Sequence, residues 1–367
     1  MKSQDYLRQI SIHLSHLYSF ARQMNELDFA GSLTGEFRGM QDAGWTTTIT
    51  AQEVFHEISS YFDKKDRPKA EMRIVLLLYC QLAEAGGVYE TIKNMMGIVT
   101  STPYLLWPFK DLVRVKQAPK RIIGPNANAT FRDLATTAKA IGLSKLSELL
   151  ESVFRDDIRN GISHADYVIW NDGLRLRKRN GGYADKLSFE EVSDAISRGV
   201  GFFQILNEIG RASVESFDPP KEIIGRFSAN PPMPWTVSFD PKTGSFSISG
   251  SSPGPVITPE YERQVAINEL LGGNVLAVFT KAETPFSKQV DDHILSTGFE
   301  PNNVAFGDDE LAALIAKVTT SGLWDERAPH AVDGDVLLAS PWGFRWIFGP
   351  KDFDSLLPEP ILNFQFG

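Results

Sequence analysis

The stretch "SELLESVFRDDIRNGISHADYVIW", residues Ser147–Trp170, decides how the first half of the chain is interpreted. Apolar residues recur in it every four positions: Leu150, Phe154, Ile158 and Ile162. This spacing predicts an amphipathic helix, within a predicted span of Leu143–Ala165, whose apolar stripe packs on a core.

Polar residues of the same helix form a second line, about 200° around the axis from the apolar stripe. Asp156, Asn160 and His164 lie on this line, and Arg159 is one position from it with a side chain long enough to reach it. A histidine exchanges a proton near neutral pH, and an arginine fork holds a phosphate and its developing charge, while an asparagine orients either. These groups fit metal-independent RNA cleavage by attack of the ribose 2′-hydroxyl. They also fit the solvated face of an ordinary helix, and spacing alone leaves both interpretations open.

Proton transfer at both the attacking and the leaving oxygen is easier with two groups, whereas this helix carries one histidine. A homodimer that pairs the polar line across a two-fold axis would place two histidines and two arginines in one cleft. We therefore expect a homodimer.

The segment "IRNGISHADY" resembles the signature of the HEPN superfamily, in which an arginine, usually followed by a polar residue, precedes a histidine by four to six intervening positions. Arg159, the polar Asn160 and His164 match this pattern, with four residues between arginine and histidine. The resemblance implies a helical dimer with a composite cleft, and a metal-independent endoribonuclease of a toxin-antitoxin or antiviral system. One toxin branch carries a tyrosine two residues after the histidine, where this chain has Asp166.

In this interpretation His164 is the acid/base, Arg159 clamps the phosphate and the transition state, and Asn160 orients them. Asp156 positions Arg159 or His164. The alternative is a non-catalytic HEPN-like module that binds a nucleotide or RNA, or serves dimerisation, while the C-terminal domain recognises a partner.

The chain is longer than one core usually supports, which favours two domains. Residues 1–213 predict a mainly α, HEPN-like domain with its core at about 60–213, and residues 214–235 predict a proline-rich linker. Residues 236–367 predict a smaller α+β domain of unknown role. The helices expected in the first domain are Ser3–Leu27, Ala51–Phe62, Pro68–Ala85, Val88–Met96, Pro103–Val115, Leu143–Ala165 and Ser188–Arg211.

Charge divides unevenly along the chain, whose net charge is -9. From residue 215 onward there are 10 Lys+Arg against 21 Asp+Glu, a net -11, which leaves 27 bases and 25 acids before it, a net +2. An acidic domain tethered to a basic one is expected to sense a partner or to lie over the RNA surface and restrain it.

Two basic segments are candidate RNA-binding surfaces. A hairpin near residues 167–180 carries Arg175, Arg177, Lys178 and Arg179, with Trp170 or Tyr183 available to stack on a base. Such charges also suit a solvated edge hairpin. Lys120 and Arg121 lie in the second segment, 110–132, where residues 117–130 are expected to form a loop.

Composition limits the other possibilities. The one cysteine, Cys80, lies in an apolar run and is expected to be a core residue, and His13 and His16 lack the further ligands of a metal site. We expect no cofactor and no metal. The absence of a long apolar run predicts a cytoplasmic protein without a membrane partner. RNA and an antitoxin or sensor protein are the expected partners.

Overall fold

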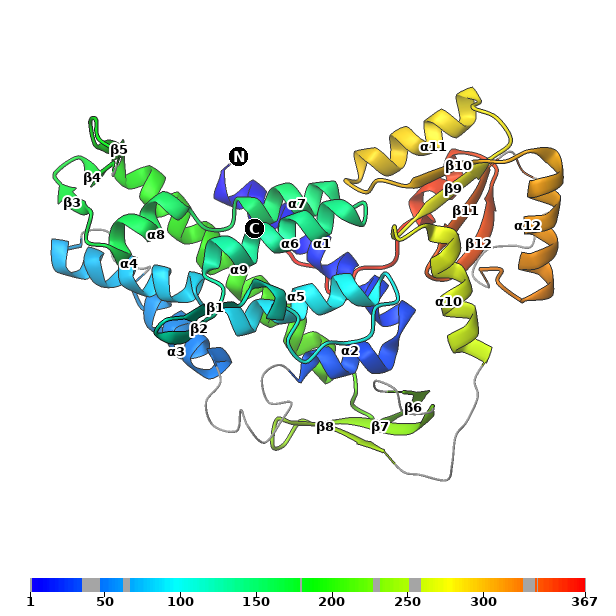
Figure 1. Cartoon of the computed structure of the whole chain (residues 1–367), viewed down its shortest axis with the longest axis horizontal. Coiled ribbons are helices and arrows are strands. Elements are labelled where there is room, and N and C mark those ends of the chain that lie inside the picture. Colours follow the sequence, from blue (N-terminus) through cyan, green and yellow to red (C-terminus); the bar gives the residue numbers. More distant parts are fainter. Residues whose placement is uncertain are drawn as a thin grey trace.

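The computed structural model describes residues 2–34, 47–61, 67–178, 180–226, 232–250, 259–325, 334 and 336–366. The first part of the chain is mainly helical and a smaller α/β region follows it (Figure 1), so the predicted fold class is confirmed at this level. The helices of the first part are α1 (Ser3–Met24), α2 (Glu26–Leu33), α3 (Thr47–Ser59), α4 (Lys69–Ala83), α5 (Gly86–Ile98), α6 (Ala127–Ala140), α7 (Ser144–Glu151), α8 (Asp156–Ser163) and α9 (Phe189–Glu215). Among the residues that the structure describes, no helix combines the length and the apolar composition needed to cross a membrane.

Short antiparallel strands interrupt the helices. They form a two-stranded sheet, β1 (Arg114–Gln117) with β2 (Lys120–Ile123), and two three-stranded sheets, β3 (Tyr167–Trp170), β4 (Gly173–Leu176) and β5 (Asp185–Leu187), then β6 (Lys221–Gly225), β7 (Met233–Asp240) and β8 (Ser245–Gly250). The hairpin near residues 167–180 is confirmed, with Trp170 paired to Gly173. The stretch predicted as a linker contains β6, which pairs with β7 and packs on α2, so it is not an unstructured connection.

The C-terminal region is built on a four-stranded sheet in the order β10-β9-β11-β12, in which only β9 and β10 run parallel. Its elements are α10 (Pro259–Leu271), β9 (Ala277–Thr280), α11 (Pro285–Ser296), β10 (Asn302–Ala305), α12 (Asp308–Thr320), β11 (Val336–Ser340), β12 (Gly343–Ile347) and a 3-10 turn, η4 (Pro350–Ser355). Phe344 and Trp346 of β12 are buried with Phe279 of β9 in one hydrophobic cluster. This is the expected α+β region.

The helix predicted over Leu143–Ala165 is two helices, α7 and α8, separated by Ser152–Arg155. The break leaves the Arg155 backbone N–H free to donate to the hydroxyl of Tyr79 at 2.8 Å. The Phe154 ring joins an aromatic cluster that also contains Tyr79, Tyr89, Phe131 and Phe202. Long-range packing therefore overrides a helical pattern that contains no local breaker.

Two further predictions before α6 were wrong. The helix expected over Pro103–Val115 contains only a 3-10 turn, η3 (Lys110–Leu112), and then enters strand β1. The loop expected over residues 117–130 contains β2 and the beginning of α6, whose N-cap Asn126 accepts a hydrogen bond from the Ala129 N–H. Apolar spacing indicated a helix, but only part of the segment packs on the core. Phe109 is buried, whereas β1 is exposed along its length and has no packing that would support a helix.

The C-terminal region shares a hydrophobic core with the helices and is not loosely tethered to them. The Phe20 ring of α1 lies 5.7 Å from that of Phe299 and 5.4 Å from that of Trp342. Between α6 and α7, the Gly142 carbonyl accepts from the Glu300 N–H at 2.7 Å. The sheet β9–β12 lies at the opposite end of the molecule from α8 (Figure 1), so this part of the acidic region does not cover α8, as one of the two expectations for it required.

Candidate functional site

Helix α8 is short and packs by one face against α4 and β4. Ile158 and Ile162 are buried on that face, as the apolar stripe predicted. Glycine at position 161 allows the close approach of Leu176 from β4, because a Cβ at this position would lie 2.6 Å from Cδ2 of Leu176 and this side chain would have to shift. The opposite side of α8 carries Asp156, which is exposed together with Asn160 and His164.

The end of α8 fixes the position of His164. The His164 N–H still donates to the Asn160 carbonyl at 3.1 Å, so His164 caps the helix and its side chain is exposed. Ala165 then adopts a left-handed conformation with φ 55°, and the Asp166 N–H returns to the Gly161 carbonyl at 2.8 Å. A left-handed alanine costs on the order of 1 kcal/mol, and the closed turn holds it there. The histidine thus lies on a rigid helix end and directly before β3.

The sequence had suggested that Arg159 reaches outward to the polar line, but the structure turns it inward. Its side chain is 7% exposed. Its Nη1 pairs with Oε1 of Glu84, and its Nη2 donates to Oδ1 of Asn160 at 3.0 Å. Its Nε is buried without a hydrogen-bond partner among the described residues. Burying a guanidinium requires a partner charge, and Glu84 supplies it. The structure therefore joins Arg159 to Asn160 but places the arginine beneath the surface.

Glu84 is the site residue that the sequence analysis missed. It caps the C-terminus of α4, and its side chain is 38% exposed. Its second oxygen accepts from the Ala127 N–H, the first residue of α6, at 2.9 Å. One carboxylate thus connects α4, α6 and α8. A local signal existed, because an acidic residue at a helix C-terminus opposes the helix dipole and needs a cation or an N–H donor nearby.

Asp156 does not position Arg159, which was one of its predicted roles. Among the residues described by the structure, its carboxylate has no hydrogen-bond or ion-pair partner, and the neighbouring acid is the one engaged. Asp157 accepts from Nε and Nη2 of Arg155 at 3.0 and 2.5 Å. Asp156 instead contributes an exposed negative charge to the first turn of α8, where such a charge is favourable.

Cys80 lies under the site and is a core residue, as expected. Its Sγ approaches the Arg159 carbonyl at 3.9 Å. Burial raises the pKa of its thiol to about 12, against a smaller opposing effect of Arg159. The thiol is therefore protonated at neutral pH and cannot act there as a nucleophile.

The basic residues of the β3–β4 hairpin are largely paired within the hairpin and its surroundings. Arg175 lies 2.7 Å from Asp172, and Lys178 lies 2.8 Å from Asp185, while the Arg177 guanidinium is 3.5 Å from Asp166. Arg179 lies outside the described residues. Trp170 and Tyr183 are exposed, as stacking on a base would require. The hairpin thus offers aromatic surface but little uncompensated positive charge.

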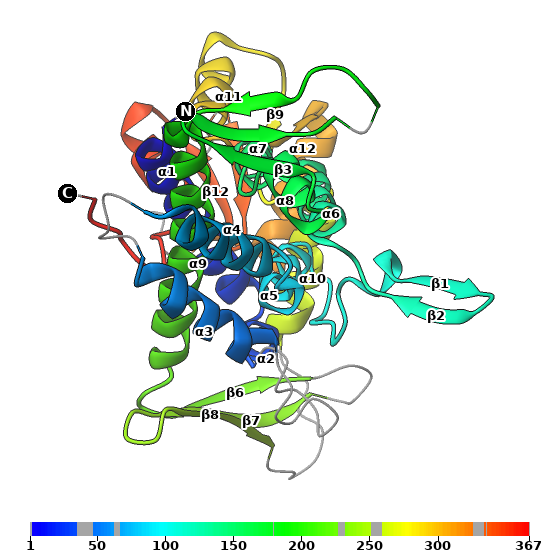
Figure 2. The same cartoon turned by 90° about the vertical axis from the view of Figure 1, so that its left-hand side faces the viewer.

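Lys120 and Arg121 lie in strand β2 of a hairpin that projects from the helical body (Figure 2). Both are exposed, and neither forms an ion pair with any residue that the structure describes. The segment that carries this positive charge is therefore an extended arm and not the expected loop.

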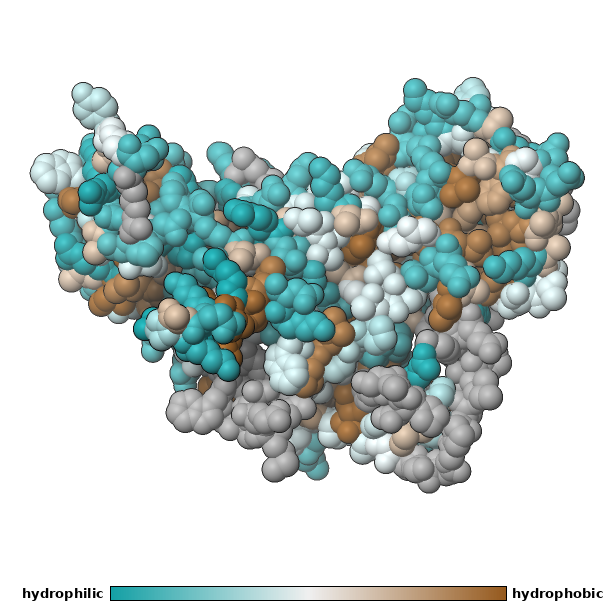
Figure 3. All heavy atoms as spheres, viewed as in Figure 1, coloured by the Kyte–Doolittle hydropathy of each residue, from teal (hydrophilic) through white to brown (hydrophobic). Residues whose placement is uncertain are grey.

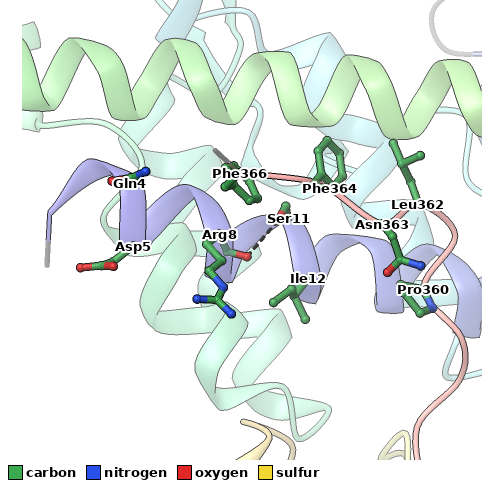
Figure 4. Close-up of a pocket in the computed structure, with 10 residues that line it drawn as sticks. All are labelled: Gln4, Asp5, Arg8, Ser11, Ile12, Pro360, Leu362, Asn363, Phe364 and Phe366. Carbon is green, nitrogen blue, oxygen red and sulfur yellow. Dashed lines mark hydrogen bonds between the residues drawn. The ribbon is translucent and has the colours of Figure 1, made fainter.

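A separate pocket of about 500 Å³ lies between α1 and the C-terminal tail (Figure 4). Asp5, Arg8 and Ile12 of α1 line it together with Asn363 and Phe366 of the tail. Its charged side chains are one acid and one base, so it has no strong preference for a ligand of either sign. The pocket contains none of the α8 residues.

Comparisons of the chain with protein-family models, with curated proteins and with solved structures find no match. The HEPN resemblance therefore rests on the motif of Arg159–His164. Any functional assignment therefore depends on the residues around α8.

Proposed function

We propose that this protein is a HEPN-like, metal-independent endoribonuclease, in which α8 supplies half of a composite cleft in a homodimer. The observation that supports this proposal is the arrangement of Asn160 and His164. They are exposed one helical turn apart on the same side of α8, and the buried Arg159 holds the Asn160 amide. A solvated helix face needs no buried arginine behind it.

The hydrogen bonds of Asn160 and Arg159 indicate which of their groups remain available for catalysis. Oδ1 of Asn160 accepts from Arg159, so its NH₂ group is the donor that remains for an RNA phosphate. Arg159 uses one N–H toward Glu84 and one toward Asn160, so it acts on the phosphate from beneath the surface, through its charge and through the Asn160 amide that it orients. His164 transfers the proton of the 2′-hydroxyl or of the leaving 5′-oxygen.

The expected dimer has a suitable surface beside this site. Leu77 and Glu84 lie seven residues apart on α4, hence on one helix face, and Leu77 is 54% exposed. Ile74, one turn earlier, is also exposed. Pairing two copies through this apolar strip places the two α8 helices close together. Leu77→Glu should therefore give a monomer by light scattering, whereas Leu295→Glu, an equally exposed change on the distant α11, should not.

Cleavage of a labelled RNA in EDTA tests the activity. We expect His164→Ala and Asn160→Ala to reduce the rate by a factor of about 10² or more, with unchanged circular dichroism because both side chains are exposed. His56→Ala removes an exposed histidine from α3 and is the matched control. Cleavage that survives His164→Ala at the wild-type rate contradicts the assignment.

The second candidate is a non-catalytic module that binds RNA or a nucleotide, or serves dimerisation. The burial of Arg159 and its pairing with Glu84 favour this alternative, because a neutralised guanidinium is a weaker phosphate clamp. Binding that weakens in Asn160→Ala, together with no cleavage by the wild-type protein, identifies the module. An antitoxin or sensor protein belongs to the proposal through the HEPN resemblance alone, and a cytoplasmic setting belongs to it through the absence of a long apolar run in the sequence.

A further inference from the structure

The hairpin Arg114–Ile123, here called the arm, is built from two strands that pack on each other and on no other element to a comparable extent. It projects away from the helices into solvent (Figure 2). Isolated two-stranded hairpins are only marginally stable in water, and this arm buries no residue fully. Its composition is therefore not explained by a contribution to the core.

The charged residues of the arm are placed where they destabilise the hairpin. The register pairs Lys116 directly with Arg121 across the strands, and Arg114 lies on the same face two residues away. Like charges directly opposite each other destabilise a sheet. None of these three bases forms an ion pair with any residue in the described ranges, and the sequence has no acid between Leu112 and Arg132. The arm differs in this respect from the β3–β4 hairpin, whose bases have acidic partners.

The other face of the arm is partly apolar. Val115 is paired with Ile122, which is 75% exposed, and Gln117 is paired with Lys120 on the same face. In Figure 3, hydrophilic atoms cover the region of the arm and a hydrophobic band lies beside it. Nucleic-acid strands present both a charged backbone and apolar base faces, and an arm with these two faces matches that combination.

The root of the arm leads directly to the α8 site. The chain leaves β2 at Ile123 and reaches Ala127 four residues later. The Ala127 N–H donates to Glu84, and Glu84 pairs with Arg159. A strand held along the arm is therefore guided toward the surface under which Arg159 lies.

We propose that the arm is the substrate-holding element of the α8 site. It binds the sugar-phosphate backbone of a single RNA strand on the side of the cleaved linkage, with Arg114, Lys116 and Arg121 on successive phosphates. That the bound RNA is a substrate rests on the proposed function, whereas RNA binding by the arm does not require cleavage. The protein consequently favours RNA long enough to occupy both the arm and the cleft over short oligonucleotides.

Binding to a fluorescent 2′-O-methyl RNA strand tests the arm, because this probe lacks the attacking hydroxyl. The variant Lys116→Gln/Arg121→Gln is compared with Lys242→Gln/Lys351→Gln, which removes two exposed charges elsewhere. We expect the arm variant to bind more weakly and to lower the slope of log Kd against log salt by about 1.4, the value for two lost phosphate contacts on a single strand. The control should keep the wild-type slope.

The outcomes separate the arm from the catalytic proposal. With a cleavable RNA, the arm variant should raise KM for a long strand and leave kcat unchanged. If the protein binds RNA through the arm but never cleaves it, the proposed cleavage fails and the arm assignment stands. If cleavage occurs and the arm variant keeps wild-type Kd, salt slope and KM, the arm assignment is wrong. Loss of binding to phosphatidylserine vesicles with unchanged RNA affinity would instead make the arm a membrane contact and overturn the proposal.

Discussion

Removing the carboxylate of Glu84 should destabilise the protein more than a surface ion pair does. Truncating one partner of a fully buried pair costs about 3–5 kcal/mol, because the other charge stays buried and unpaired. The Arg159 side chain is 7% exposed but that of Glu84 is 38% exposed, so water compensates part of the loss. Glu84→Ala also removes the acceptor of the Ala127 N–H at the beginning of α6. Together we expect a loss of about 3 kcal/mol in the free energy of unfolding.

Urea denaturation followed by circular dichroism measures this loss, and a double-mutant cycle with Arg159→Met isolates the pair. The coupling should be about 2 kcal/mol, since the double variant no longer buries an unpaired charge. Glu148→Ala is the matched control, because its partner Lys145 lies 2.9 Å away but Glu148 is 68% exposed. The control should change stability by about 0.5 kcal/mol or less. A coupling energy below that of an exposed pair would refute the reasoning about Glu84.

Two further predictions concern the pH dependence of the free energy of unfolding and the glycine between α6 and α7. Burial lowers the pKa of His13 and of His16 from 6.5 to about 4, so the unfolded chain binds these protons more readily. Stability should fall as the pH drops from 6.5 to 4, by at most about 3 kcal/mol per histidine. Asp28, whose pKa burial raises to about 6, acts with the opposite sign, so Asp28→Asn should steepen the acid loss in urea titrations. Gly142→Ala should destabilise the protein by more than 2 kcal/mol, since Gly142 has φ 80° and a Cβ would lie 2.4 Å from a backbone oxygen. Gly244→Ala, with φ 70° but open space around it, should cost about 1 kcal/mol, and equal urea midpoints for the two variants would contradict this account.

Elements with a strong local signal were predictable from the sequence. The capping box of Ser188 and Glu191 marked the beginning of α9, and the structure contains both of its hydrogen bonds. The turn after Asp240 marked the β7–β8 hairpin, where the Gly244 N–H donates to the Asp240 carbonyl at 2.8 Å. In both cases the deciding interactions join residues that are three or four positions apart.

The environment of the candidate site was not predictable, because its deciding contacts are long-range. Helical spacing placed Asn160 and His164 on an exposed side of α8, which the structure confirms. The same spacing could not show that Arg159 turns inward, since its partner Glu84 lies 75 positions earlier in the chain. The break before α8 also involves a distant residue, because the Arg155 N–H there donates to the Tyr79 hydroxyl.

The arrangement of charge gives the C-terminal region a role other than covering the site. Residues 215–367 carry a net charge of -11. The sheet β9–β12 and its helices, which belong to this part of the chain, lie at the end of the molecule remote from α8 (Figure 1). The unpaired bases of the arm lie nearer the other end. A polyanion that approaches such a molecule is repelled from one end and attracted to the other, so encounters at low salt are biased toward the arm. Deleting residues 215–367 cannot test this idea cleanly, because Phe20 and its neighbours would lose the aromatic surface of Phe299 and Trp342. Neutralising an exposed acid such as Asp309 keeps that core intact and removes a repulsion, so RNA association at low salt should become faster while the dissociation rate stays the same.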